Sequence, residues 1–148
     1  MGDMMSKSAQ PVATDLIGAW RLESWAFIYE DGRAPEYPLG NDAKGFILYT
    51  PDGHVSAMLA RAIRQPLLTG DASEKARAYD DSFAYAGRFE VRDGAVFHSI
   101  EVSTSPTLAG FTSTRNIQLE GDRLTLSGPD FTANTARTQR IVWQRARK

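Results

Sequence analysis

Hydrophobic and polar residues alternate along most of this chain with the two-residue period of half-buried β-strands. Asp-Gly or Gly-Asp pairs, which favour tight hairpin turns, interrupt the alternation at residues 31–32, 52–53, 93–94 and 121–122. The runs around these turns predict about eight strands, at residues 18–30, 44–50, 54–60, 87–92, 95–104, 111–120, 123–128 and 134–146. We therefore expect a mainly β protein.

One segment, residues 71–86, follows a helical period instead. Its apolar side chains recur at steps of three and four residues, at Ala72, Ala76, Tyr79, Phe83 and Ala86. Asp71 and Glu74 form a capping-box pattern at its start, and Gly87 is placed to end it. The pattern predicts one α-helix between the third and fourth strands.

The tight turns also indicate how the strands pair. Strands joined by such turns are antiparallel neighbours, and eight of them can close into a barrel that leaves no exposed edge. We therefore predict an eight-stranded antiparallel β-barrel over residues 15–148, with the helix plugging one mouth. A two-sheet sandwich is the alternative. The polar residues 1–14 are expected to form a disordered leader.

Composition and charge narrow the class of protein. The 148 residues suit one domain, and 17 basic against 18 acidic residues lack the basic excess of a nucleic-acid-binding surface. No cysteine is present, and the two histidines lie 44 residues apart, so we predict neither a metal nor another cofactor. No segment has the apolar length of a signal peptide or membrane span, which predicts a cytoplasmic protein without a membrane partner.

The hairpin around Asp93-Gly94 has one apolar face that should point into the barrel. That face contains Phe89, Val91, Val96, His98, Ile100 and Val102. His98 is its only polar member, and burial without a hydrogen-bond partner would cost about 1–3 kcal/mol. We therefore expect His98 to be either a structural histidine bonded to another protein group or a residue that faces a ligand.

The hairpin around Gly121-Asp122 repeats this arrangement. Its apolar face contains Phe111, Ser113, Arg115, Ile117 and Leu119, opposite Leu124 and Leu126. Arg115 interrupts the face, and a buried guanidinium needs an anion or several carbonyl acceptors. The acceptor could belong to the protein, or to a ligand that presents a carboxylate, a carbonyl or a phenolate.

The hairpin at residues 45–59 has an aliphatic face and a mixed face. We assign Phe46, Leu48, Val55, Ala57 and Leu59 to the first, and Ile47, Tyr49, His54, Ser56 and Met58 to the second. Tyr49, Ser56 and Met58 combine apolar bodies with a few polar atoms, the composition of a pocket wall. The mixed face is therefore predicted to line a cavity, with the aliphatic face as the alternative interior.

Several segments of the sequence resemble the lipocalin-like domain family, a group of small, mostly bacterial proteins. They are residues 16–24 (LIGAWRLES), 37–59 (YPLGNDAKGFILYTPDGHVSAML), 84–91 (AYAGRFEV), 121–127 (GDRLTLS) and 141–146 (IVWQRA). The resemblance extends from Leu16 to Ala146. It implies a calycin-type barrel that holds a small, largely apolar molecule, and it implies no particular reaction.

The resemblance also implies a role for the tryptophans near the chain ends. In lipocalins a Gly-x-Trp tryptophan, here Trp20, closes the barrel floor, often beneath a late arginine such as Arg140 or Arg145. Trp143 should lie on the neighbouring strand.

Three aromatic residues of the first strand, Trp25, Phe27 and Tyr29, fall on the opposite phase from Trp20. This predicts either a bulge near Ser24 or an outer apolar patch that could form a homodimer contact.

The leading interpretation is a binding module that carries or sequesters a small, largely hydrophobic molecule. Its predicted ligand-binding residues are Tyr49, Ser56, Met58, Phe89, His98, Ile100, Arg115, Ile117 and Trp143. The alternative is a cofactor-independent cyclase or isomerase acting on an apolar, polyketide-like substrate, with His98 transferring a proton and Arg115 stabilising an oxyanion. A third interpretation is a structural or oligomeric partner with a filled barrel.

Overall fold

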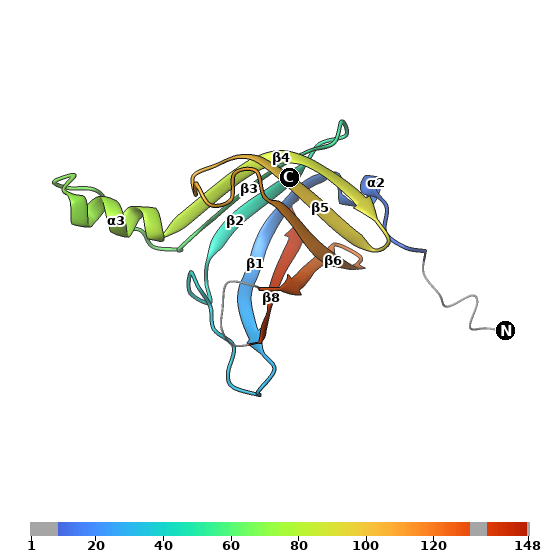
Figure 1. Ribbon diagram of the computed structural model, residues 1–148, viewed down its shortest axis with the longest axis horizontal. Coiled ribbons are helices and arrows are strands. Elements are labelled where there is room, and N and C mark those ends of the chain that lie inside the picture. Colours follow the sequence, from blue (N-terminus) through green and yellow to red (C-terminus); the bar gives the residue numbers. More distant parts are fainter. Residues whose placement is uncertain (1–8, 131–135, 148) are drawn as a thin grey trace.

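The computed structural model describes residues 9–130 and 136–147. In chain order its elements are α2 (Ala13–Leu16), β1 (Gly18–Tyr29), β2 (Lys44–Tyr49), β3 (His54–Ala60), α3 (Ala72–Asp80), β4 (Ser82–Arg92), β5 (Ala95–Ser103), β6 (Thr112–Glu120), β7 (Arg123–Pro129) and β8 (Arg137–Arg145). The eight strands form a closed antiparallel barrel in which β1 pairs with β8 (Figure 1). The predicted barrel is confirmed and the sandwich alternative is wrong. Most of the predicted leader lies outside the described residues.

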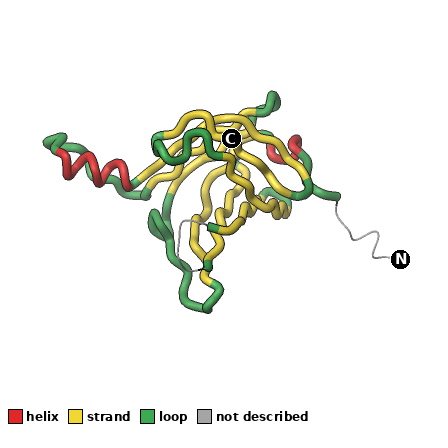
Figure 2. Tube along the Cα trace, in the orientation of Figure 1, coloured by secondary structure: helices red, strands yellow, loops and turns green. Residues whose placement is uncertain are grey.

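The connections between strands alternate between two ends of the barrel (Figure 2). The short turns at residues 50–53, 93–94 and 121–122 lie at the end where α2 precedes β1, which we call the α2 end. The longer connections at residues 30–43, 61–81 and 104–111 lie at the opposite end, which we call the long-loop end. At the turn between β4 and β5, Asp93 and Gly94 both have positive φ, as a tight hairpin requires.

The helix between the third and fourth strands is shorter than predicted. It begins after Asp71, whose side chain accepts a hydrogen bond from the Glu74 backbone, and it ends at Asp80. The prediction that residues 82–86 are helical is wrong, because they form the start of β4 and pair with β3. That pairing satisfies their backbone hydrogen-bonding groups and packs Phe83 against the core, which outweighs the helical spacing.

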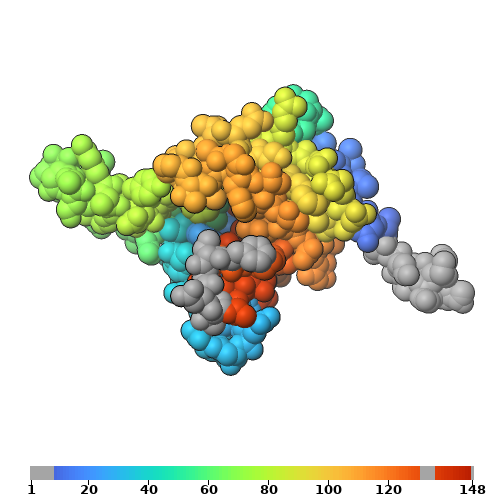
Figure 3. All heavy atoms as spheres, in the orientation of Figure 1, coloured from blue at the N-terminus to red at the C-terminus, as the bar shows by residue number. Residues whose placement is uncertain are grey.

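The α3 helix does not plug the barrel. It projects from the long-loop end together with residues 61–71 (Figure 3), and none of its residues is buried. Only its last residues, Tyr79 and Asp80, reach the cavity described below.

Because no residue of α3 is buried, the stability of this helix should depend on its N-terminal cap. We expect Asp71→Ala to destabilise the helix by about 1 kcal/mol, since the Glu74 backbone N–H loses its acceptor at 2.9 Å. Hydrogen exchange should then quicken at residues 72–80 while the melting temperature of the barrel stays unchanged. Ser73→Ala is the matched control in the same turn. A fall in the melting temperature with Asp71→Ala would show instead that α3 unfolds together with the barrel.

Trp20 forms the centre of the packing at the α2 end. Its side chain is fully buried, and its indole N–H donates to the Leu16 carbonyl at 2.9 Å. The Arg145 guanidinium lies 4.2 Å from the ring centroid, so the expected late arginine over this tryptophan is confirmed as Arg145. Arg140 is exposed. Trp143 lies on the neighbouring strand as expected, paired with Leu22.

The inward face of β1 changes at a bulge. The register with β8 shifts between Leu22 and Ser24, so Trp20 and Leu22 point inward before the shift while Trp25 and Phe27 line the cavity after it. The predicted bulge is confirmed, and the alternative of an outer patch built from these aromatic residues is wrong. One strand therefore serves both the packed core and the cavity.

The β2–β3 hairpin has different faces from those predicted. The register pairs Ile47 with Ala57 and Tyr49 with Val55, so all four side chains point inward and are buried. The predicted grouping was wrong because it offset the two strands by one residue, and such an offset moves a strand's side chains to the other face. The outward face instead carries Phe46, Leu48, His54, Ser56 and Met58, all exposed.

The β4–β5 hairpin matches its predicted faces except at one end. Phe89 pairs with His98, and both side chains are buried together with Val96 and Ile100. A register shift between Ala86 and Gly87 then turns Val102 outward, where it is 62% exposed. The prediction that Val102 points inward is wrong because the period of two does not continue across the shift.

Candidate ligand-binding site

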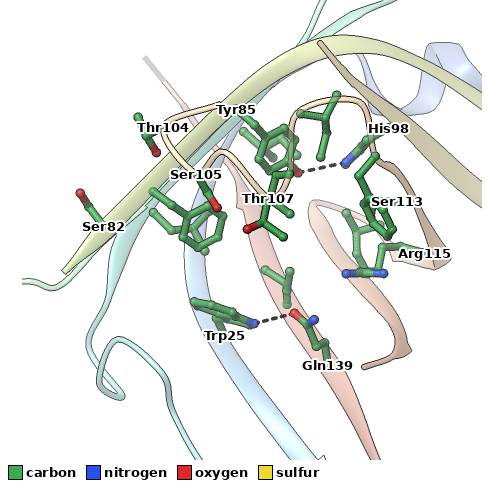
Figure 4. A pocket seen from close by; sticks show the side chains of 18 of the residues that line it. Trp25, Ser82, Tyr85, His98, Thr104, Ser105, Thr107, Ser113, Arg115 and Gln139 are labelled. Carbon is green, nitrogen blue, oxygen red and sulfur yellow. Dashed lines mark hydrogen bonds between the residues drawn. The ribbon is translucent and has the colours of Figure 1, made fainter. Parts of the chain in front are cut away.

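A cavity of about 440 Å³ extends into the barrel from the long-loop end. This volume suits a small organic molecule. Most of the lining side chains are aromatic or aliphatic; they include Trp25, Phe27, Phe83, Leu108, Phe111 and Ile141. A smaller number of polar residues lie among them, including Tyr85, His98, Ser113, Arg115 and Gln139 (Figure 4). The wall therefore combines an apolar majority with hydroxyl, imidazole, guanidinium, amide and carboxylate groups.

Both ring nitrogens of His98 are hydrogen-bonded to tyrosine hydroxyls. The Nε2 atom lies 2.8 Å from the Tyr49 hydroxyl. The Nδ1 atom lies 3.0 Å from the Tyr85 hydroxyl (Figure 4). Burial lowers the pKa of His98 to about 3, and the nearby charge of Arg115 acts in the same direction. The imidazole is therefore neutral at neutral pH. His98 combines the two roles considered for it, since it is internally bonded and also lines the cavity.

The two tyrosines differ in their access to the cavity. Tyr85 lines it, whereas Tyr49 lies behind His98, with its ring packed edge-on against Phe89 at 4.7 Å between centroids. Burial raises the pKa of Tyr85 to about 12, although the charge of Arg115 opposes this effect. Burial also raises the pKa of Tyr49 well above its usual value. Both hydroxyls are therefore protonated at neutral pH.

Arg115 on β6 brings a positive charge to the cavity wall. Its Nη1 atom donates to the Thr114 carbonyl at 2.9 Å, and among the described residues no carboxylate forms an ion pair with it. Asp130 also lines the cavity, but its Oδ2 atom accepts a hydrogen bond from Arg137 at 2.6 Å. Burial lowers the pKa of Arg115, while Tyr85 and Asp130 act to raise it. The guanidinium is thus partly desolvated and only partly compensated by the protein.

Gly128 on β7 makes room for this arginine. A Cβ atom there would lie 3.3 Å from both Cδ and Nη1 of Arg115, and 3.1 Å from the Thr114 carbonyl oxygen. The absence of a side chain at Gly128 therefore lets the Arg115 side chain lie along the cavity wall.

Two tryptophans line the cavity. The Trp25 indole donates to Oε1 of Gln139 at 3.1 Å (Figure 4). The Trp143 indole N–H is buried and has no hydrogen-bond partner among the described residues, although Trp143 lines the cavity. A buried N–H without an acceptor costs about 1–3 kcal/mol.

The structure brings together some of the predicted ligand-binding residues and separates others. His98, Ile100, Arg115 and Trp143 line the cavity. Tyr49, Phe89 and Ile117 belong to the core or pack against it, without lining the cavity.

Ser56 and Met58 are exposed on the outer face of β3. The prediction that they point inward is wrong, for the register reason given above. Whether any of the nine residues contacts a ligand stays a prediction.

Sequence reasoning missed Tyr85 and Gln139. Tyr85 fell inside the segment assigned to the helix, although Phe83 and Tyr85 also fit the two-residue period that continues to Gly87 and Phe89. Gln139 lies on β8 among residues of mixed polarity, and no pattern singled it out. The loop at residues 104–108 also contributes to the lining.

In the part of the chain that the structure describes, no group of three or more histidine, aspartate or glutamate side chains is placed to hold a metal ion. None of the described helices combines the length and apolar character that a bilayer span requires.

Comparison with known proteins gives three findings. A family model described as a lipocalin-like domain matches residues 17–146. Over 71 residues, 43% of this chain, the sequence is 38% identical to the 4'-hydroxy-3'-methoxypropiophenone carrier protein ppsC of Aspergillus oryzae (strain ATCC 42149 / RIB 40), and the match spans 64% of that protein. A solved lipoprotein, YedD from Klebsiella pneumoniae subsp. pneumoniae MGH 78578, has a TM-score of 0.43 and 12% identity, covering 97% of this chain and 82% of that chain.

Proposed function

Because this chain belongs to the lipocalin-like domain family, we propose that it binds and carries a small, largely hydrophobic molecule inside its barrel. The observation that supports this most directly is the cavity of about 440 Å³, whose wall is apolar over the larger part and also carries polar groups that could orient a ligand. The Aspergillus oryzae relative is named as the carrier of a substituted aromatic ketone. A small substituted aromatic molecule is accordingly our proposed ligand class.

The alternative, a cofactor-independent cyclase or isomerase, has less support from the site. A general base works best with a pKa near the operating pH, whereas the pKa of His98 is lowered to about 3 and both of its nitrogens are bonded to tyrosines. Carrying a ligand needs no proton transfer. The cytoplasmic location and the homodimer stay predictions.

The proposal is tested by filling the cavity. Ser113 is buried and lines it, whereas Thr114, next on the same strand, is exposed on the outer face. Wild-type protein should bind the neutral dye N-phenyl-1-naphthylamine saturably, with enhanced fluorescence and one dye per chain by native mass spectrometry. Ser113→Phe should weaken binding by at least about tenfold because the ring occupies the cavity.

Thr114→Phe is the matched control and should bind the dye as the wild type does. Failure of the wild-type protein to bind the dye would contradict the proposal. Equal binding by the wild type and Ser113→Phe would place the dye somewhere other than the cavity, and would contradict it too.

A further inference from the structure

The hydrogen bonds around His98 determine which of its two tyrosine partners has a hydroxyl proton free to donate to another group. A neutral imidazole carries one N–H, so it donates to one tyrosine hydroxyl and accepts from the other. If Nε2 carried the proton, Tyr49 would accept it and its own hydroxyl proton would need another acceptor. If Nδ1 carries the proton, Tyr49 donates to Nε2 and Tyr85 accepts from Nδ1.

The burial of Tyr49 favours the second arrangement. Tyr49 is 2% exposed, and its hydroxyl has no hydrogen-bond partner other than His98 among the described residues. Leaving its proton without an acceptor would cost about 1–3 kcal/mol. The proton therefore lies on Nδ1 of His98, and the hydroxyl proton of Tyr85 is left free. Since Tyr85 lines the cavity and Tyr49 does not, this free donor belongs to the cavity.

Apart from the exposed carboxylate of Asp80 at the long-loop end, other polar groups of the cavity lining carry N–H donors that lack described acceptors. An indole N–H can only donate, so the Gln139 atom that faces Trp25 is the amide oxygen, which leaves the Gln139 NH₂ group without a described acceptor. Arg115 contributes guanidinium N–H groups beyond the one that donates to Thr114. The Ser and Thr hydroxyls of the lining can donate or accept, so they impose no preference.

Charge points the same way as the donors. Arg115 is partly buried at the cavity wall without an ion-pair partner among the described residues. Two carboxylates also line the cavity: that of Asp130 is paired with Arg137, and that of Asp80 is exposed to solvent at the long-loop end. A partly desolvated cation is stabilised most by an anion that also accepts its hydrogen bonds. A neutral carbonyl would satisfy the donors but would leave this charge uncompensated.

Building on the proposed carrier function, we infer that the cavity selects aromatic ligands with an acidic oxygen and binds them as the anion. Arg115 and the hydroxyl of Tyr85 contact the ionised oxygen, which is a phenolate, an enolate or a carboxylate. The aromatic residues of the wall, among them Trp25, Phe83 and Phe111, contact the rest of the molecule. Tyr49 and His98 are positioning residues, because they hold Tyr85 as a donor.

A matched pair of ketones tests this inference. 4'-Hydroxyacetophenone and its methyl ether, 4'-methoxyacetophenone, have similar shapes, but only the first can ionise. Each should be used to displace N-phenyl-1-naphthylamine, above and below the pKa of the free phenol. Above that pKa the phenol should displace the dye at least about tenfold better than the ether. The absorbance of the bound phenol should show its pKa lowered by about one unit, which is the same tenfold preference.

Variants separate the contacts. Arg115→Gln should abolish the preference for the phenol while still binding the ether and the dye, and Arg115→Lys should retain part of it. Tyr85→Phe should reduce the preference by about fivefold. Arg140→Gln removes an exposed arginine from the outside of the barrel and should change nothing. Nitrogen-15 NMR should show the proton of His98 on Nδ1, and a proton on Nε2 would overturn the assignment of Tyr85 as the free donor.

The two proposals fail in different ways. If the wild-type protein binds the dye but the phenol and the ether displace it equally, the preference for an anion is wrong while the carrier function stands. If the wild-type protein binds neither the dye nor either ketone, the carrier function is wrong and the inference fails with it.

Discussion

Lowering the pH from about 6.5 to about 4 should reduce the free energy of unfolding by about 3 kcal/mol through His98 alone. In the unfolded chain this histidine takes up a proton near its ordinary pKa of 6.5, whereas in the folded protein burial lowers the pKa to about 3. Between these values the unfolded state binds more protons than the folded state. The contribution to stability is therefore complete above about pH 6.5 and is lost as the pH falls toward 3.

Urea denaturation at a series of pH values measures this effect. The wild type should lose about 1.4 kcal/mol per pH unit through His98 once the pH is well below 6.5, in addition to any contribution from carboxyl groups. His98→Gln should start from a lower stability but show a correspondingly shallower loss. His54→Gln, whose side chain is half exposed next to a turn, controls for the removal of a histidine as such. Equal slopes in the wild type and His98→Gln would contradict the prediction, as would an NMR titration of His98 near pH 6.5.

Replacing Trp20 by alanine should lower the free energy of unfolding by about 3–5 kcal/mol. Trp20 is fully buried, so the substitution leaves a cavity at the α2 end. The Leu16 carbonyl loses the hydrogen bond that the Trp20 indole N–H donates to it. The Arg145 guanidinium loses the aromatic ring beneath it. The loss therefore combines packing, one buried hydrogen bond and a cation–π contact.

Chemical denaturation of Trp20→Ala and Trp25→Ala provides the comparison. Trp25 is only partly buried, because it lies at the cavity wall, so its replacement should cost about 1–2 kcal/mol. Trp20→Phe should recover part of the loss by restoring most of the buried volume. Equal losses for the two alanine variants would show that the packing at the α2 end does not dominate the stability of the barrel.

The strands and the closure of the barrel could be predicted because they depend on local signals. The Asp-Gly and Gly-Asp pairs at residues 52–53, 93–94 and 121–122 lie in short hairpin turns, whereas the pair at 31–32 lies in the long connection between β1 and β2. The alternation around Asp93-Gly94 correctly placed His98 inside. The two-residue period of the next hairpin likewise predicted that Arg115 points into the barrel, and it lines the cavity. In each case a tight turn fixed the register, so the inward face could be read from the sequence.

The remaining features depend on contacts that local patterns do not specify. In the β2–β3 hairpin the turn at residues 50–53 sets Tyr49 opposite Val55, and this register cannot be derived from the alternation of either strand alone. Tyr85 was assigned to a helix because its true partners, β3 and His98, are distant in sequence. The bond between His98 and Tyr49 joins residues 49 positions apart, and only the closed barrel brings them together.

The bulge between Leu22 and Ser24 has a consequence for how such a barrel can diversify. On the α2 side of the bulge, β1 contributes Trp20 and Leu22 to a densely packed core; beyond it, the same strand contributes Trp25 and Phe27 to the cavity wall. Residues beyond the bulge can therefore be exchanged for others of different size or polarity at a modest loss of stability. The packed core supplies enough folding stability to tolerate that loss. Evolution or a protein engineer can retune the choice of cargo at positions 25 and 27 and leave the folding determinants of the barrel untouched.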